Sequence, residues 1–197
     1  MINWRPAIEG FDPTFPAPLD AIDPGLLGGG LAAEAREDFE IALRGSLQDV
    51  ESKLAMGPGA HMMNATGSLT GMDGTRELLS DHEVDYAYDD AAVETALAGM
   101  SRKVAGRAAE LRFASFTYYV RMGEPGSPGP QRITIRRSTE WQNKDAPKPA
   151  GTLEAVCVDM EHRSGVALAV FMPYDHRVGR LHLGDLVGGP SHRRFWG

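Results

Sequence analysis

A histidine beside a carboxylate is the pattern in this sequence that could support acid–base chemistry. The chain of 197 residues contains 6 histidines and 27 Asp or Glu residues. Asp175 and His176 follow each other directly after the apolar segment GVALAVFMPY. Histidine titrates near neutral pH, so such a pair could exchange a proton with a bound substrate. Because an adjacent pair on a turn also suits simple exposure to water, Asp175 and His176 are only weak candidates for catalytic residues.

The same region raises the question of a metal site. A tetrahedral site needs three or four nitrogen, sulfur or oxygen ligands close together. Asp159, Glu161 and His162 end one predicted strand, and Asp175 and His176 end the next, so ligands would converge if these two ends met. The spacing of the histidines matches no recognised metal motif. We therefore expect no metal and no cofactor.

Covalent catalysis would need a serine or cysteine beside a base. Cys157 lies inside the apolar stretch TLEAVCVDM, which favours a buried small side chain. Ser68 in GSLTG does not fit a nucleophile elbow, because the serine stands one place early. The GLLGGG run before the first predicted helix could bind an anion only weakly, since no strand leads into it. These patterns favour a protein that is not an enzyme.

The composition limits the class of protein. Hydrophobic residues make up 42% and charged residues 24%, which is typical of a soluble globular protein. The longest apolar runs are too short to span a bilayer, and the N-terminal sequence MINWRPAIEGFDP does not look like a secretory signal. With 1 cysteine no internal disulfide can form. We therefore expect a cytoplasmic protein that does not bind membranes.

The net charge of −7 is divided unevenly along the chain. Residues 1–110 carry 8 Lys or Arg and 19 Asp or Glu, a net of −11, whereas residues 111–197 carry 12 and 8, a net of +4. The basic excess is small and scattered, and no aromatic–basic motif accompanies it, so nucleic-acid binding is not expected. The two halves could instead attract each other within or between chains.

The segment QRITIRRSTEW is a candidate binding surface. Its alternation places Arg132 and Arg136 on one strand face and Trp141 on the other. Paired arginines can hold a carboxylate or an acidic partner, although a solvated strand face would show the same pattern. Arg132, Arg136 and Trp141 are therefore candidate binding residues.

Two segments have the period of an amphipathic helix. The first covers 31–55, and its apolar stripe consists of Phe39, Leu43, Leu47, Val50 and Leu54. Such a stripe must be buried, either on the main domain or on a second copy, so all five are candidate association residues. The second helix is expected over about 90–109, and a short helix is expected over 75–82.

From residue 111 the pattern changes to that of strands. We expect strands over 111–122, 131–141, 152–160, 165–173 and 180–186. Their short connections predict an antiparallel meander of four or five strands packed on the 90–109 helix, which is an α+β fold. At the level of the fold this resembles the cystatin-like, cone-shaped α+β proteins, in which a sheet wraps a helix.

The segments before the predicted sheet define the domain organisation. The first 30 residues combine prolines with interleaved apolar residues, which indicates an extended arm lying on an apolar surface. The stretch LAMGPGAHMMNATGSLTGMDG at 54–74 has no period, and it could be a flexible linker, an ordered loop over a pocket, or a join introduced by cloning. The predicted division is an arm and helix at 1–56, a linker or loop at 57–74, and a compact α+β domain at 75–197.

Together these features predict a non-enzymatic interaction or accessory protein. It would associate with another protein or a second copy through the N-terminal arm and helix, by apolar burial and complementary charge. The alternative is a small-molecule-binding cup or small enzyme, with a pocket between the 90–109 helix and the sheet. That pocket would involve Tyr118, Tyr119, Trp141 and Tyr174 together with Asp175 and His176.

Overall fold

The structure is a computed structural model that describes residues 5–6, 33–55, 66–79, 92–123, 134–135, 152–177 and 180–196. Its helices are α1 (Ala33–Ala55) and α2 (Ala92–Gly106). Its strands are β1 (Arg5–Pro6), β2 (Thr66–Gly71), β3 (Arg76–Leu79), β4 (Leu111–Gly123), β5 (Thr134–Ile135), β6 (Thr152–His162), β7 (Ala167–Arg177), β8 (Arg180–Leu183) and β9 (Val187–Pro190). No helix among the described residues is long and apolar enough to cross a membrane.

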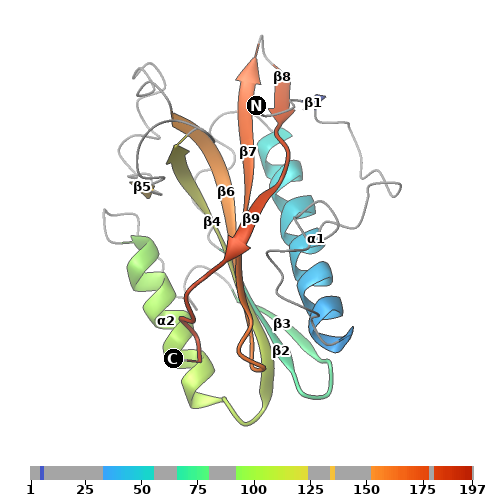
Figure 1. Ribbon diagram of the computed structural model, residues 1–197, viewed down its shortest axis with the longest axis vertical. Helices are drawn as coiled ribbons and strands as arrows, with labels where there is room; N and C mark the ends of the chain where they lie inside the picture. The colour runs from blue at the N-terminus through green and yellow to red at the C-terminus, as the bar shows by residue number, and fades with distance from the viewer. Residues whose placement is uncertain are drawn as a thin grey trace.

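The strands form one antiparallel sheet in the order β1-β8-β7-β6-β4-β2-β3 (Figure 1). The α+β class is therefore confirmed. The predicted meander is only partly right, because β4 pairs directly with β6 over its whole length. The short β5 pairs with Val120 and Arg121 on the β4 edge opposite β6, while β8 and β9 follow each other along one edge of β7.

The β2–β3 hairpin lies where the sequence predicted a linker, a loop or a join over 54–74 and a short helix over 75–82. A flexible linker is wrong for residues 66–71, and the helix is wrong for residues 76–79. β2 is an interior strand between β3 and β4, and RELL forms β3. A tight turn brings the two strands together: the Asp73 carboxylate accepts hydrogen bonds from the Thr75 N–H and hydroxyl, and Gly74 has a φ of 84°. Pairing within the sheet thus overrides the helix propensity of RELL. Residues 56–65 of the aperiodic stretch lie outside the described residues.

The central strands bury side chains on both faces of the sheet. In β4 the even-numbered residues from Ala114 to Val120 pack with α2, whereas Phe113 and Tyr119 pack on the side of α1. Figure 1 shows the two helices on opposite sides of the sheet. The predicted packing on the 90–109 helix therefore describes one face, and α1 covers the other.

The apolar stripe of α1 is part of the core. Phe39 and Leu43 are fully buried, and Phe39 meets the edge of the Phe113 ring at a centroid distance of 5.2 Å. Val50 is buried nearby, and Leu47 is half-buried against the same clusters. Burying each large side chain stabilises the fold by about 1.5–3 kcal/mol. Of the two alternatives for this stripe, the structure shows packing on the chain's own sheet, so Phe39, Leu43 and Val50 have no free surface to offer a partner.

The remaining parts of the N-terminal prediction are described only in fragments. Arg5 and Pro6 pair with Leu183 and His182 of β8, which adds a short strand at the edge of the sheet. The rest of the arm and the side chain of Leu54 lie outside the described residues. Residues 33–55 and the sheet share one core, so the helix predicted as part of a separate association module belongs to the α+β unit.

Candidate functional site

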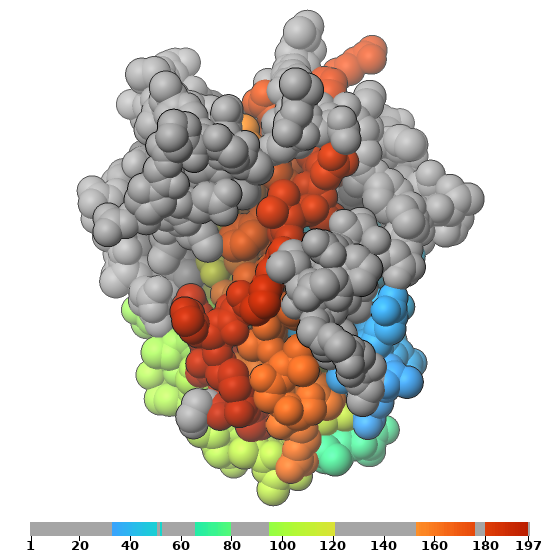
Figure 2. Space-filling view, viewed as in Figure 1, coloured from blue at the N-terminus to red at the C-terminus, as the bar shows by residue number. Residues whose placement is uncertain are grey.

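A groove lies at one end of the sheet, where the β2–β3 hairpin meets the turn between α2 and β4. Figure 2 shows hairpin atoms at the lower margin of the molecule. The groove has a volume of about 380 Å³, and we call it the hairpin groove. It is lined by Leu69, Gly71, Met72, Asp73, Thr75, Glu77, Arg107, Glu110 and Leu111.

Backbone contacts give the hairpin groove a defined shape. The Gly71 N–H donates to the Thr75 carbonyl at 2.8 Å, and the Met72 N–H donates to the Glu110 carbonyl at 2.7 Å. The second bond ties the hairpin to the α2–β4 turn. A Cβ at Gly71 would lie 2.7 Å from Asp73 Oδ1, so a larger residue here would displace the Asp73 carboxylate that holds the turn. The groove is therefore built on a constrained turn.

The rim of the groove is acidic overall. Arg107 donates to Glu77 at 2.6 Å and to Glu110 at 3.3 Å, and these two contacts raise the pKa of its guanidinium. Asp73 adds a further carboxylate, whose pKa is lowered first by the backbone hydrogen bond from Thr75. Within the lining of the groove one cation, Arg107, faces three carboxylates. All of these groups are exposed, so each single ion pair contributes little to stability. Two further cations lie beside the turn: Arg163 donates to Met72 Sδ at 2.9 Å, and the charge of Arg112 also lowers the pKa of Asp73.

The hairpin also carries exposed apolar side chains. Met72 is 51% exposed in the groove, whose floor is formed by the buried side chains of Leu69 and Leu111. Leu78 is 75% exposed and pairs with Ser68, so it lies on the other face of the hairpin. These are the large hydrophobic side chains classed as exposed in the described parts of the chain, and both belong to this one hairpin.

A buried charge cluster on the opposite side of the sheet connects α1 to β4. Arg112 Nε lies 2.9 Å from Asp38 Oδ2, and its Nη2 donates to Oδ1 at 3.1 Å. The Asp38 side chain is fully buried, whereas Glu34, the second partner of Arg112, is 59% exposed. The hydrogen bond from Arg112 to Asp38 raises the pKa of the arginine, so its guanidinium stays charged. The cluster anchors α1 electrostatically and holds its N-terminal half on the sheet.

His162 borders this cluster at the end of β6. Its Nδ1 accepts a hydrogen bond from the Ser164 N–H at 3.1 Å, which places the proton of the neutral ring on Nε2. Nε2 lies 3.9 Å from Asp38 Oδ2. Burial lowers the pKa of His162, although the nearby Asp38 charge acts in the opposite direction. The ring is therefore neutral near pH 7.

A second buried polar group lies on the α2 side of the sheet. The Tyr118 hydroxyl donates to Asp159 Oδ2 at 2.7 Å, and Ser191 donates to Oδ1 at 3.3 Å. Burial raises the pKa of Tyr118, and the same cause raises the pKa of the fully buried Cys157 thiol. Both groups thus stay protonated, and Cys157 is the buried small side chain that the sequence predicted.

The residues considered for a metal site do not converge. β6 and β7 are antiparallel, so Asp159 lies opposite Ala169, while Asp175 lies at the far end of β7 and pairs with His182 of β8. The condition for a metal site, that the two strand ends meet, therefore fails. Within the described residues no group of three His, Cys, Asp or Glu side chains could hold a metal ion. The side chain of His176 lies outside the described part.

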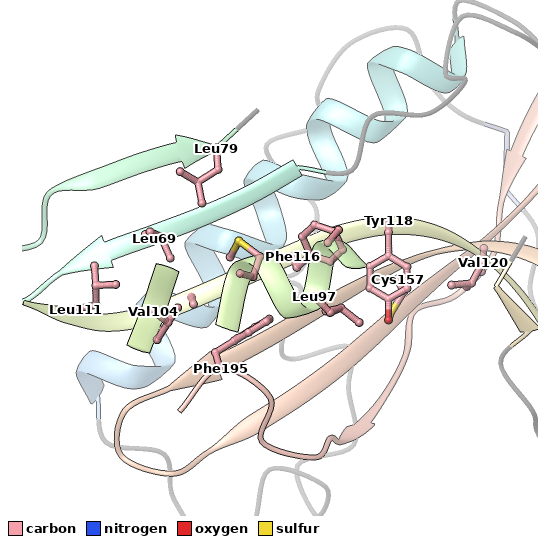
Figure 3. Close-up of a cluster of buried hydrophobic side chains, with 14 residues drawn as sticks. Leu69, Leu79, Leu97, Val104, Leu111, Phe116, Tyr118, Val120, Cys157 and Phe195 are labelled. Atoms are coloured by element: carbon pink, nitrogen blue, oxygen red, sulfur yellow. The ribbon is translucent and has the colours of Figure 1, made fainter. Parts of the chain in front are cut away.

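The predicted binding residues have different positions. Tyr174 is buried against Tyr119 on the α1 side, with the two rings edge to face at a centroid distance of 6.3 Å. Arg132, Arg136 and Trp141 lie outside the described residues. The space between α2 and the sheet, where the sequence predicted a pocket, is occupied by buried apolar side chains, including Leu97, Val104 and Phe195 (Figure 3).

One alternative for 54–74 was an ordered loop over a pocket, but the sequence reasoning did not predict the hairpin that forms the groove, although MDGT carried a signal for it. An Asp-Gly pair followed by threonine is a turn pattern, and alternating residues flank it in SLTGMDGTREL. Comparisons with protein-family models, with curated proteins and with solved structures give no match for this chain. The site must therefore be interpreted from its own geometry.

Proposed function

We propose that this chain is a non-enzymatic interaction protein and that the β2–β3 hairpin is its contact surface. The observation that carries the proposal is the position of Met72 and Leu78, which expose apolar side chains on the two faces of one hairpin. Large exposed hydrophobic side chains that gather in one place favour a protein contact. A partner that covers the outer edge of β3 would contact both faces at once.

The charges beside Met72 define the chemistry of that partner. The net negative rim of Asp73, Glu77, Arg107 and Glu110 favours a basic side chain whose aliphatic stem lies on the groove floor. Lysine and arginine have this combination of stem and charge. Arg163 already contacts the Met72 sulfur at 2.9 Å, so the partner's charge is expected on the Glu77 and Glu110 side. The association role of the N-terminal arm remains part of the proposal, supported by the pairing of Arg5 and Pro6 with the edge strand β8.

The buried ionisable groups support a non-enzymatic role. Asp38 holds Arg112 between α1 and the sheet, and Asp159 receives the Tyr118 hydroxyl in the core. Each contact joins two elements of the fold, so these groups have a structural use that accounts for their burial.

A photo-crosslinking residue at position 78 tests the proposal. We expect crosslinks to protein from position 78 and from position 72 in cells that express the chain. The matched control is position 98, an exposed alanine of α2. A product of twice the chain mass identifies a second copy, and any other mass identifies a different protein. Equal crosslinking from position 98, or none from the hairpin, would refute the proposal.

The alternative of a small-molecule cup is supported by one observation. The volume of the hairpin groove, about 380 Å³, falls within the range of small-ligand sites. Its acidic rim would favour an organic cation, such as an alkylamine. Calorimetry with butylamine tests this alternative. Binding to the wild type that is lost in Glu77→Gln would support it, whereas equal heats from the wild type and the variant would exclude it.

A further inference from the structure

The carboxylate of Glu161 is bound by a short segment from the far end of the described chain. Its side chain is 2% exposed. Oε2 accepts hydrogen bonds from the N–H groups of Arg194 and Phe195, both at 2.7 Å. Oε1 accepts from Arg193 Nε at 2.9 Å and from the Trp196 N–H at 3.2 Å. Consecutive backbone N–H groups that surround an anion form a nest, and here the segment supplies the nest while Glu161 supplies the anion.

The same segment places an aromatic side chain in the core. Phe195 points into the apolar cluster between α2 and the sheet (Figure 3), and it is 4% exposed. The Ser101 hydroxyl of α2 donates to the Arg194 carbonyl. Arg193 and Arg194 themselves are exposed. The segment is thus recognised through its backbone, one arginine and one buried ring, as a bound peptide would be.

The segment follows directly on β9, and its first residue is also bound to the sheet: the Ser191 N–H donates to the Ala167 carbonyl of β7 at 2.9 Å, and the Ser191 hydroxyl donates to Asp159 Oδ1 at 3.3 Å. Val187–Pro190 forms β9, whose sequence VGGP contains two glycines. A Cβ at Gly189 would meet nothing within 4 Å, so no packing requirement holds this position. A change of direction between β9 and residues 191–196 would break the two Ser191 contacts, to Ala167 of β7 and to Asp159, and would leave the pairing of β7 with β9 in place. Both contacts can form again when the segment binds a second copy.

An empty site would be unfavourable. Glu161 would keep a buried charge without donors, and the place of Phe195 would become a cavity lined by apolar side chains. A ligand that fits this site must supply adjacent backbone N–H donors, a basic side chain and an aromatic ring, in the order in which residues 193–196 supply them. A second copy of this chain carries that segment.

We propose that the Glu161 site is a peptide-binding site whose ligand is the 191–196 segment, and that a second copy supplies the segment in trans. Two copies that exchange the segment would form a symmetric pair with both sites filled. This inference does not depend on the hairpin contact, because it uses a different part of the sheet.

A labelled peptide with the sequence of residues 190–197 tests the binding site directly. In the wild-type chain the internal segment competes at an effective concentration of about millimolar, so peptide binding is weak. The full chain with Phe195→Ala keeps the segment but loses its buried anchor. We expect this variant to bind the peptide at least about tenfold more tightly than the wild type, measured by fluorescence anisotropy.

Three comparisons make the test specific. Glu161→Gln in the Phe195→Ala background should lose about tenfold or more in peptide affinity, because the charged acceptor is gone. Glu37→Gln, an exposed site on α1, is the matched control and should change nothing. If Phe195→Ala does not fold, Arg193→Ala replaces it, since that side chain is 42% exposed. A folded variant that binds no more tightly than the wild type would overturn the proposal.

The mass of the full chain tests the part played by a second copy. Wild-type protein refolded at near-millimolar concentration should contain dimers that are absent after refolding at micromolar concentration. The dimer should be lost in the Phe195→Ala or Arg193→Ala variant. Monomers alone at both concentrations, measured by light scattering, would exclude exchange between copies.

Discussion

Removing Asp38 should show whether α1 is anchored by charge as well as by apolar packing. Asp38→Ala takes away a fully buried carboxylate. It leaves Arg112, whose side chain is 15% exposed, paired with Glu34. At 2.9 Å and an effective dielectric constant of about 20, the attraction between the two charges is roughly 6 kcal/mol. Part of this is offset by the cost of desolvating both groups, so breaking the pair should cost about 3–5 kcal/mol.

Glu34→Ala is the matched control in the same cluster. Its carboxylate also pairs with Arg112, but it is 59% exposed. Water screens this pair, so its loss should cost less than about 1 kcal/mol. Asp38→Leu combined with Arg112→Met removes both charges and should restore most of the stability, because no unpaired charge stays buried.

Urea unfolding followed by circular dichroism measures these differences. The midpoint should fall strongly for Asp38→Ala and only slightly for Glu34→Ala, with the slope of each transition unchanged. Equal losses for the two variants would show that burial does not strengthen the Asp38 pair. A double variant no more stable than Asp38→Ala would show that the unpaired arginine is not the cause of the loss.

Three further predictions follow from single residues. Burial lowers the pKa of His162, so the unfolded chain binds a proton at this histidine more readily than the folded chain. The free energy of unfolding should therefore be highest above the ordinary pKa of 6.5 and should decline as the pH falls through it. Urea midpoints should show a smaller decline in His162→Gln. Cys157, whose pKa burial raises, should react with a thiol reagent at pH 8 only after unfolding. Gly74→Ala should lower the free energy of unfolding by about 1–2 kcal/mol, because φ at Gly74 is 84°. Gly45→Ala, inside α1 with free space around it, should raise the free energy of unfolding by roughly 0.5–1 kcal/mol in the same assay.

Strong periodicity made the long elements predictable. The stripe of Phe39 and Leu43 and the dense apolar runs of β6 and β7 follow one period over many residues, so tertiary contacts reinforce the local pattern. RELL in β3 is too short for a period, and its residues favour a helix in isolation. Its strand conformation comes from pairing with β2, which the local sequence does not encode.

The Asp38 cluster shows why buried charges were harder to find. Glu34 and Asp38 stand four residues apart in the acidic run EAREDFE, which looks like the solvated face of a helix. The orientation of α1 on the sheet carries Asp38 inward and leaves Glu34 exposed. A carboxylate directly beside Phe39 of the apolar stripe, together with an arginine at the start of a strand, was the available signal.

The position of the two helices restricts where any partner can bind. Antiparallel sheets commonly leave one face to solvent, which gives a partner a broad surface. Here β4 and β6 bury side chains under α1 on one face and under α2 with Phe195 on the other. Contacts to a second molecule must then use an edge, an end, or a segment that replaces one of the chain's own. The β2–β3 hairpin is such an end, and the 191–196 segment on Glu161 is such a replaceable piece. Substitutions in the helix stripes should therefore change stability. Substitutions at Leu78 should change binding and leave the free energy of unfolding, measured by urea, within about 0.5 kcal/mol of the wild type.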